Sequence, residues 1–249
     1  MAITMCGYSG AVASGPEIVS WSSGDINKIQ AMLDANYEGS INLSDYWSIG
    51  DGRTVSYTSS QLGDTSRTWV ITDMSTKTDN KKTSGGTRYN AVIHTREISN
   101  TVQYMNSSNT NVGGWNSSYM RSTIMPQLYN ALPSDFKSLI KSASIISGAG
   151  NASNTTQTTT DNLWLFSEYE VQGATTYAGS AEAGYCKQFD YFKTSSNKIK
   201  YYNGSSAGGW WLRSPYVSNA VGFCNVDSGG SADIYYASYP DRVAPAAII

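Results

Sequence analysis

The sequence contains few of the residues on which most metal and catalytic sites depend. Its 249 residues include one histidine, His94, and three widely separated cysteines, Cys6, Cys186 and Cys224. Scattered cysteines in odd number form no CxxC zinc pair and define no disulfide framework, although a single disulfide stays open. We therefore expect no metal and no cofactor, mostly buried thiols, and a structural role for His94 on an apolar strand.

Charge and long apolar runs are also scarce. Charged residues make up 14% of the chain and the net charge is −2, so we expect no nucleic-acid surface, which requires a basic stripe. No run of about 18 apolar residues occurs, so we expect no membrane insertion. The opening "MAITMCGYSGAVASG" has no basic region and no sustained apolar core, so we also expect no signal peptide.

Five residue types are missing from the last 36 residues, Ser214 to Ile249, which we call the C-terminal segment. It holds no Lys, Glu, Gln, Trp or Met, although the first 213 residues hold 37 residues of these types. A Gly/Ser/Tyr-rich β region is one explanation. The other is genetic: randomising both adenines of the asparagine codon AAC reaches every amino acid except these same five.

Gly, Ser, Thr, Asn and Tyr are abundant instead, a composition that suits a loop-rich binding surface. Ile26, Ile29, Met32 and Leu33 predict an amphipathic helix between Ser23 or Asp25 and Gly39. Residues 41–59 predict two strands around a Gly-Asp-Gly turn, and residues 67–74 and 89–98 predict a strand each.

The middle of the chain predicts further helices. Met120, Ile124 and Leu128 predict one helix, with Pro126 as a possible kink, and Ser134 is predicted to cap a second. Tyr185, Phe189 and Phe192 are spaced like a packed helix face. Short strands separated by glycines follow residue 208. Helices and strands are segregated rather than alternating, which favours an α+β fold.

Three motifs point only weakly to catalysis or metal binding. "GSSAG", residues 204–208, matches the G-x-S-x-G pattern around Ser206, but no later histidine follows. Glu168 and Glu170 in "SEYE" do not form a facing carboxylate pair on a strand. "DMSTKTDN" lacks the spacing and glycine of a calcium loop. We expect structural roles for all three.

The strongest motif is "WWLRSP", because two adjacent tryptophans followed by arginine predict a buried anchor. "GGWWLRSP", "FCNVDSGGSA" and "ASYPDRVAPAAII" resemble a family of gut-phage and bacterial proteins, as do "LYNALPSDFKSLIK", "LWLFSEYEVQG" and "FDYFKTSSNKIKYYNG". Several members are variable proteins of diversity-generating retroelements. The resemblance covers residues 116–249 well and the earlier part loosely. Arg242 stands where the family has glycine, which leaves the end of the variable region open.

The resemblance implies two classes of position in and near a variable region, residues 214–242. The scaffold positions are Trp210, Trp211, Arg213, Ser214, Pro215, Phe223, Cys224, Val226, Gly229, Ala232, Ala237, Val243, Ala244 and Pro245. The display positions, expected to be exposed and to bind ligand, are Tyr216, Val217, Ser218, Asn219, Asn225, Asp227, Asp233, Ile234, Tyr235, Tyr236, Ser238, Tyr239, Asp241 and Arg242.

It further implies a single C-type lectin-like α+β domain over residues 1–249, with residues 1–40 as a helical lead-in. Short strands and loops would display the variable region, and adenine-directed mutagenesis would diversify it. We expect a binding protein and no enzyme, in a phage tail or receptor-binding component on the virion, or at a cell surface. Its partner would be a bacterial surface protein or glycan, and a homo-oligomer such as a trimer would raise its avidity.

Two alternatives stay open. A bacterial cell-surface adhesin would use the same domain. A relative of formylglycine-generating enzymes would need reactive cysteines or a metal. Calcium-dependent sugar binding is not expected, because the E-P-N, Q-P-D and W-N-D motifs of calcium lectins are absent.

Overall fold

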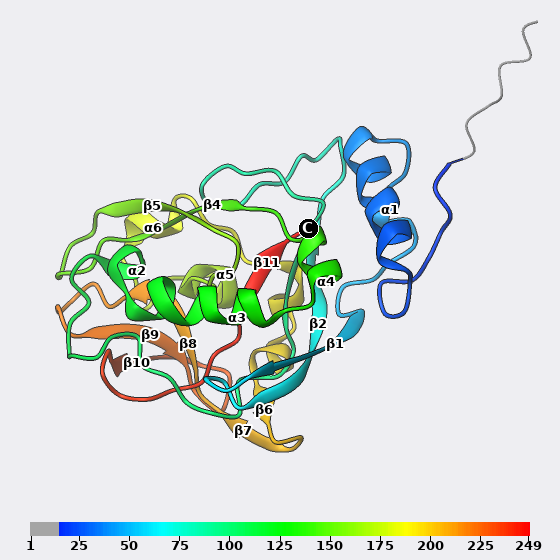
Figure 1. The fold of residues 1–249 in the computed structure, drawn as a ribbon. Coiled ribbons are helices and arrows are strands. Elements are labelled where there is room, and N and C mark those ends of the chain that lie inside the picture. The colour runs from blue at the N-terminus through cyan, green and yellow to red at the C-terminus, as the bar shows by residue number, and fades with distance from the viewer. Residues whose placement is uncertain (1–14) are drawn as a thin grey trace, which may run out of the picture.

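A four-stranded antiparallel sheet runs through the middle of the computed structural model, which describes residues 15–249 (Figure 1). Its strands lie in the order β1 (Gly52–Ser59), β2 (Asp64–Met74), β3 (Ala91–Thr95) and β11 (Ala246–Ile248). The predicted strands at 67–74 and 89–98 are confirmed. All five residues of β3 are buried, because both faces of the sheet are covered at this strand.

The predicted N-terminal helix is also confirmed, as α1 (Ile26–Glu38). The Asp25 carboxylate accepts hydrogen bonds from the amides of Asn27 and Lys28 and caps the helix start. Gly39 ends the helix with φ 84°, in the left-handed region that favours glycine. Cys6 and the rest of residues 1–14, part of the expected lead-in, lie outside the described residues.

Two local predictions are wrong. Residues 41–51 form no strand; a 3₁₀ turn (Leu43–Asp45) occurs there, and the buried Asn36 side chain accepts a hydrogen bond from the Leu43 amide. The expected helix face at 185–192 is replaced by the 3₁₀ turn η3 (Asp190–Lys193). In that stretch Phe189 and Phe192 are buried, whereas Tyr185 is exposed.

The helix pair in the middle of the chain forms with shifted boundaries. A π-helical turn (Met120–Ile124) leads into α3 (Met125–Ala131), and α4 (Ser134–Leu139) follows. Pro126 lies in the first turn of α3, directly after the π-helical turn. Pro133, rather than Ser134, occupies the N-cap of α4.

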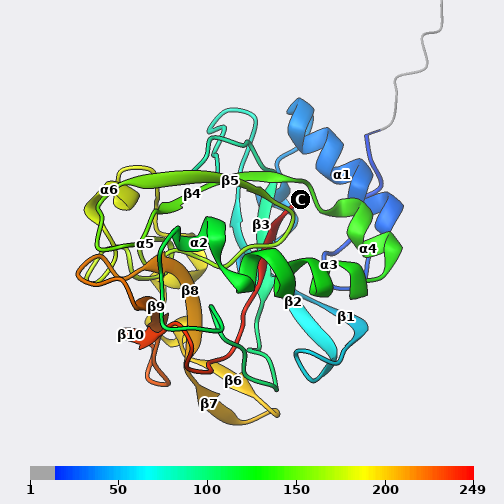
Figure 2. The same cartoon turned by 60° about the vertical axis from the view of Figure 1, so that its left-hand side comes forward.

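A second sheet carries the C-terminal segment. It has the order β10 (Ala232–Tyr236), β9 (Gly222–Val226) and β8 (Trp210–Pro215), all antiparallel. This sheet lies at the opposite end of the molecule from α1 (Figures 1 and 2). The remaining elements are short: α2 (Gly114–Ser117), β4 (Ala143–Gly148), β5 (Thr156–Asp161), α5 (Glu168–Gln172), α6 (Ser180–Ala183), η4 (Ser195–Lys198), β6 (Lys200–Tyr202) and β7 (Ser206–Gly208).

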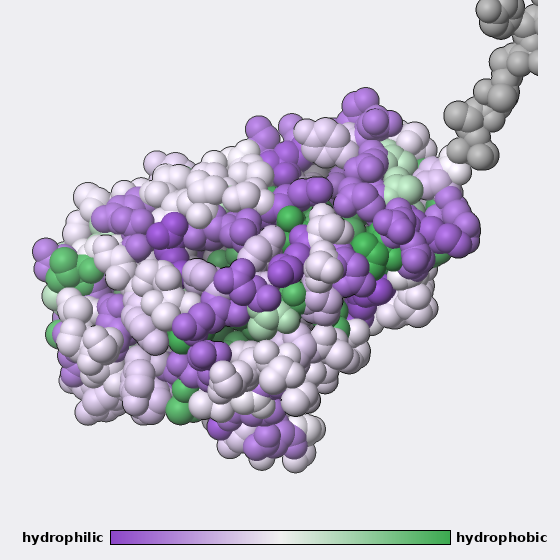
Figure 3. All heavy atoms as spheres, viewed as in Figure 1, coloured by the Kyte–Doolittle hydropathy of each residue, from purple (hydrophilic) through white to green (hydrophobic). Residues whose placement is uncertain are grey.

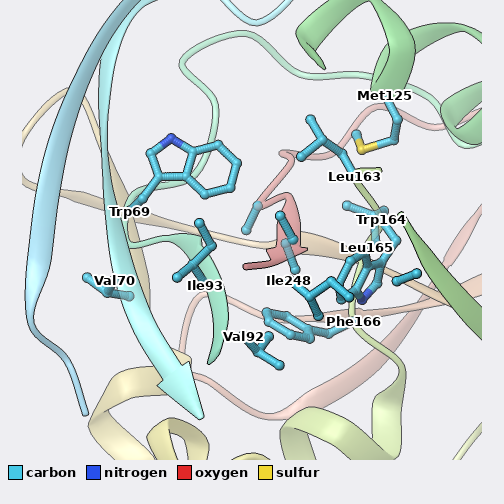
Figure 4. Close-up of a cluster of buried hydrophobic side chains, with 14 of the residues drawn as sticks. Trp69, Val70, Val92, Ile93, Met125, Leu163, Trp164, Leu165, Phe166 and Ile248 are labelled. Carbon is cyan, nitrogen blue, oxygen red and sulfur yellow. The ribbon is translucent and has the colours of Figure 1, made fainter. Parts of the chain in front are cut away.

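Buried side chains from Trp21 to Ile249 form one hydrophobic core. In Figure 4, Trp69, Ile93 and Ile248 of the central sheet gather near Met125 of α3 and the stretch that includes Phe166. The named strands pair antiparallel and the helices are grouped rather than alternating with them. The α+β class is therefore confirmed.

The surface is largely polar. On the face shown in Figure 3, hydrophobic residues form small separate areas among hydrophilic ones. None of the helices within residues 15–249 combines the length and the apolar character needed to cross a membrane.

Candidate ligand-binding surface

Strand β8 anchors the C-terminal segment to the core. Trp210, Trp211 and Arg213 are fully buried, as a scaffold role requires. The indole nitrogen of Trp210 donates to the Lys198 carbonyl (3.1 Å), and that of Trp211 donates to the Gln103 carbonyl (2.8 Å). Both indoles thus keep a hydrogen bond despite burial, so the apolar contacts are gained without an unpaired N–H.

Arg213 is buried because Glu170 pairs with it. Its Nη1 lies 2.5 Å from Glu170 Oε2 and its Nη2 lies 2.9 Å from Oε1, a two-pronged ion pair. Arg213 also donates to the carbonyls of Leu165 and Ile146. Glu170 caps α5 through a reciprocal pair of hydrogen bonds with Ser167. The charge is therefore neutralised inside the protein, and Glu170 has the structural role expected for it.

The second glutamate of the motif is also structural. Glu168 is fully buried, and its carboxylate accepts hydrogen bonds from the amides of Thr176, Tyr177 and Ala178. Its own amide donates to Ser214 Oγ. Glu168 therefore ties the segment after α5 to the end of β8, next to the loop that begins at Tyr216.

That loop, residues 216–222, is held by its main chain. The buried side chain of Asn111 directs Nδ2 at the carbonyls of Tyr216, Asn219 and Gly222, at 3.2, 2.9 and 2.7 Å. The Asn111 amide donates to the Ala220 carbonyl (2.7 Å). These partners are backbone atoms, and the loop is held in addition by its own Asn219 side chain, whose Oδ1 accepts hydrogen bonds from the amides of Val221 and Gly222. The path of the loop therefore depends little on its side chains other than that of Asn219.

Strand β10 forms the outer edge of the second sheet and carries a group of exposed tyrosines. Tyr235, Tyr236 and Tyr239 are 40%, 47% and 45% exposed. Tyr239 packs edge-on against both of the others, with ring centroids 5.4 and 5.1 Å apart. Tyr235 in turn lies over the buried Trp211, with ring centroids 6.0 Å apart, so the exposed group rests on the scaffold.

These tyrosines border a hollow of about 250 Å³, which we call the tyrosine hollow. Its lining residues come from the loop, from β9, from β10 and from the turn after β10: Asn219, Gly222, Ile234, Tyr235, Tyr236 and Tyr239. A Cβ at Gly222 would lie 3.2 Å from the Tyr235 carbonyl oxygen, so a larger residue there would press on the backbone of β10.

The structure places most display positions at the surface, to different degrees. Ser218, Asp233, Tyr235, Tyr236 and Tyr239 are exposed. Half-buried positions include Tyr216, Val217, Asn219, Asp227, Ile234, Ser238 and Arg242.

Two display positions are wrong, because Asn225 and Asp241 are buried. Asn225 Nδ2 donates to Asp241 Oδ2 (3.0 Å), and the other Asp241 oxygen accepts from the Arg242 amide. Burial raises the pKa of Asp241 to about 6, although these hydrogen bonds oppose the rise. The pair joins β9 to the stretch between β10 and β11, and it belongs to the scaffold. Conversely, the expected scaffold position Gly229 is exposed and Ala232 is half-buried, because both lie around the turn that leads into β10.

Arg242 is held within the protein rather than free to reach a partner. Its guanidinium carbon lies 3.2 Å from the centre of the Tyr202 ring, and Nη1 donates to the carbonyls of Ser99 and Asn100. Arg242 therefore contributes to the attachment of the segment more than to its display.

A segment far away in sequence completes the surface. Gln103 exchanges backbone hydrogen bonds with Asp241, and the Asn106 amide donates to the Ala237 carbonyl. Asn109 accepts hydrogen bonds from the amide and hydroxyl of Ser238, and Tyr104 is 46% exposed. Neither residue was predicted, since residues 101–111 carry no periodic pattern and no motif that marks a neighbour of the C-terminal segment.

Catalytic groups do not converge on this surface. His94 is buried elsewhere, with Nδ1 2.6 Å from Thr72 Oγ1, and burial lowers its pKa well below the usual value. Ser206 lies on the exposed strand β7 of a hairpin, not on a nucleophile elbow. Within residues 15–249, no group of three or more His, Cys, Asp and Glu side chains is arranged to hold a metal.

The two described cysteines are free thiols. Cys224 is buried, and burial raises its pKa well above the usual value. Burial also raises the pKa of Cys186, and the nearby Glu170 carboxylate adds to the effect. Both shifts oppose formation of the thiolate, the reactive form of cysteine.

The site is thus a surface on an α+β domain, formed by exposed side chains on a backbone anchored from the core. Residues 88–249 match a family described as a domain of unknown function, DUF6273, and the chain belongs to this family. No curated protein and no solved structure matches the chain.

Proposed function

We propose that this protein is a ligand-binding protein whose C-terminal surface is hypervariable and is diversified by a retroelement. In this proposal residues 1–249 form a single C-type lectin-like domain. The domain serves as a phage tail or receptor-binding component and recognises a protein or glycan on a bacterial surface.

One observation carries the proposal: the codon-limited segment is fixed through its backbone and exposes its side chains. Asn111 holds three carbonyls of loop 216–222, and the β9–β10 pairing holds the next stretch. The side chains of Asp233, Tyr235 and Tyr239 extend into solvent. A diversified surface needs this separation, because random replacement must not disturb the fold.

The composition of the exposed group supports binding rather than catalysis. Tyrosine offers a large contact area at low entropic cost and is enriched at binding hot spots. The raised pKa values of Cys186 and Cys224 oppose the alternative of a cysteine-dependent enzyme.

Sequencing of the gene in a growing population tests the proposal. We expect a reverse transcriptase gene and a near-identical non-coding repeat beside it. Substitutions should fall at adenines in codons of the exposed positions, such as Ser218, Asp233 and Tyr235. Codons for Trp210, Trp211 and Arg213 should stay constant.

The buried pair provides a second criterion. Codons for Asn225 and Asp241 should stay constant or change together, because either partner alone is left with an unpaired buried group. Substitutions spread evenly over residues 88–249, with no preference for adenine, would refute the proposal.

A further inference from the structure

We propose that the tyrosine hollow binds a basic side chain, arginine or lysine, presented by a polypeptide partner. This inference rests on the proposed function, because the hollow lies within the same surface. It adds the chemical class of the group that this particular sequence recognises.

The first argument is the charge of the surface. The C-terminal segment contains three aspartates and one arginine, with no lysine, glutamate or histidine. Arg242, the single cation of the segment, is already held by the Tyr202 ring and by two carbonyls. Asp241 is buried, and the half-buried Asp227 accepts hydrogen bonds from the amides of Gly229 and Ser231, so Asp233 is left as the exposed charge of the segment. A positively charged partner group complements this face.

The second argument is the position of Asp233 on β10. Asp233 and Tyr235 are two residues apart on this strand, so their side chains lie on the same face of it, and Tyr235 lines the hollow. Asp233 is exposed, although it is not itself one of the residues that line the hollow. In this proposal the Asp233 carboxylate attracts a cation to the side of the strand on which Tyr235 lies.

The third argument is that cations and aromatic rings pair repeatedly inside this protein. Lys200 Nζ lies 5.3 Å from the centre of the Trp210 ring, and Arg88 lies 4.0 Å from the centre of the Tyr37 ring. Within residues 15–249, no cation lies over Tyr235, Tyr236 or Tyr239. Three clustered rings, with an exposed carboxylate on the strand that carries two of them, form an electron-rich cage without an internal cation.

The lining of the hollow disfavours a sugar. Apart from the tyrosine hydroxyls, its polar side chain is Asn219, whose Oδ1 already accepts from the amides of Val221 and Gly222, at 3.0 and 3.2 Å. A sugar needs several directed hydrogen bonds, and the hollow offers few uncommitted groups for them. A plain aliphatic side chain fits the apolar lining but makes no use of Asp233.

Nuclear magnetic resonance with capped tripeptides tests the inference on the whole protein. The probes are acetyl-Gly-X-Gly-amide with Arg, Lys, Leu or Glu as X, and acetyl-Gly-Ser-Gly-amide as blank. We expect the Arg and Lys probes to shift the ring signals of Tyr235, Tyr236 and Tyr239 saturably, with an affinity that falls as salt is added. Asp233→Asn should weaken this binding about two- to five-fold.

Matched variants give the controls. Tyr236→Ser with Tyr239→Ser should abolish the shifts, whereas Tyr185→Ser, at an exposed tyrosine elsewhere, should leave them unchanged. Stronger shifts with the Leu probe, or no shift with any probe, would overturn the inference. The proposed function would survive either result if adenine-directed variation is found at the exposed codons, so the two failures are distinguishable.

Discussion

Glu182 is a buried carboxylate whose nearest cation, Arg213, is already paired with Glu170. It lies on α6, 1% exposed, with Oε1 4.0 Å from Arg213 Nε. Within residues 15–249 neither oxygen has a hydrogen-bond partner, because Arg213 is already paired with Glu170. Burial raises the pKa of Glu182 to about 7, against the opposing effect of Arg213.

This pKa predicts the sign of a pH effect on stability. Because the folded-state pKa lies above the unfolded value, the folded protein binds the extra proton between pH 4.5 and about 7. The stabilising contribution of protonated Glu182 to the free energy of unfolding is fully present below about pH 4.5 and is lost as the pH rises through about 7. Relative to Glu182→Gln, the wild type should therefore lose on the order of 2–3 kcal/mol of unfolding free energy between pH 5 and pH 8.

Urea unfolding of both proteins at several pH values measures this difference. The comparison with Glu182→Gln is necessary because Lys200, whose pKa burial lowers to about 7, titrates in the opposite direction. A pH-independent difference between the two proteins would show that Glu182 stays ionised in the folded state.

At the scale of the element, loop 216–222 depends on one side chain from a remote segment. Asn111→Ala removes the donor to three loop carbonyls and also the acceptor of the Asn151 amide (2.8 Å). Buried groups without partners cost about 1–3 kcal/mol each, so we expect a loss of at least about 2 kcal/mol of unfolding free energy.

Asn109→Ala is the matched control, since Asn109 is exposed and contacts only the start of the turn after β10. It should change stability by less than about 0.5 kcal/mol. If chemical denaturation shows equal effects for the two substitutions, Asn111 does not fix the loop as described.

Local pattern determined which elements could be predicted. Helix α1 and strands β2 and β3 follow from apolar spacing and caps that lie within the element itself. Residues 41–51 were assigned wrongly because their conformation depends on the side chain of Asn36. Burial of Arg213 was predictable from the two tryptophans before it, but its partner Glu170, 43 residues earlier, was not.

The candidate surface likewise has features that the sequence predicts and features that it does not. The tyrosines of β10 could be assigned to the surface from the residue types missing around them. Burial of Asn225 and Asp241 could not be predicted, because their hydrogen bond joins two residues that lie 16 positions apart in the sequence. The approach of residues 103–109 depends on contacts with residues more than a hundred positions away, such as the backbone pairing of Gln103 with Asp241 and the hydrogen bonds of Asn109 to Ser238, which no local pattern encodes.

At the scale of the whole molecule, display and scaffold should respond oppositely to substitution. Replacing Asp233, Tyr235, Tyr236 and Tyr239 together by serine should cost less than about 2 kcal/mol of stability and should abolish partner binding. Trp211→Ala should cost about 3–5 kcal/mol, because it leaves a cavity under the same surface. Thermal unfolding and binding of labelled protein to a panel of bacterial strains measure both effects.

Tyr201→Ser, an exposed tyrosine on β6, controls for the loss of surface aromatic area. If the fourfold serine variant unfolds while Trp211→Ala remains native, the tyrosines belong to the core and the display interpretation fails.

Removal of metal ions should leave the thermal stability of the protein unchanged. Since residues 15–249 contain no cluster of three or more potential ligands, we expect the same melting temperature with and without EDTA. A clear drop with EDTA, restored by adding one divalent cation, would reveal a structural metal.

The three carbonyls gathered by Asn111 have a consequence for comparisons between copies of this protein. Under the proposed function, copies that keep Asn111 and Asn219 and differ at the exposed positions should share one loop geometry, because these two side chains hold main-chain atoms of the loop. Differences in what such copies bind would then reflect the chemistry of the exposed side chains at a constant backbone shape.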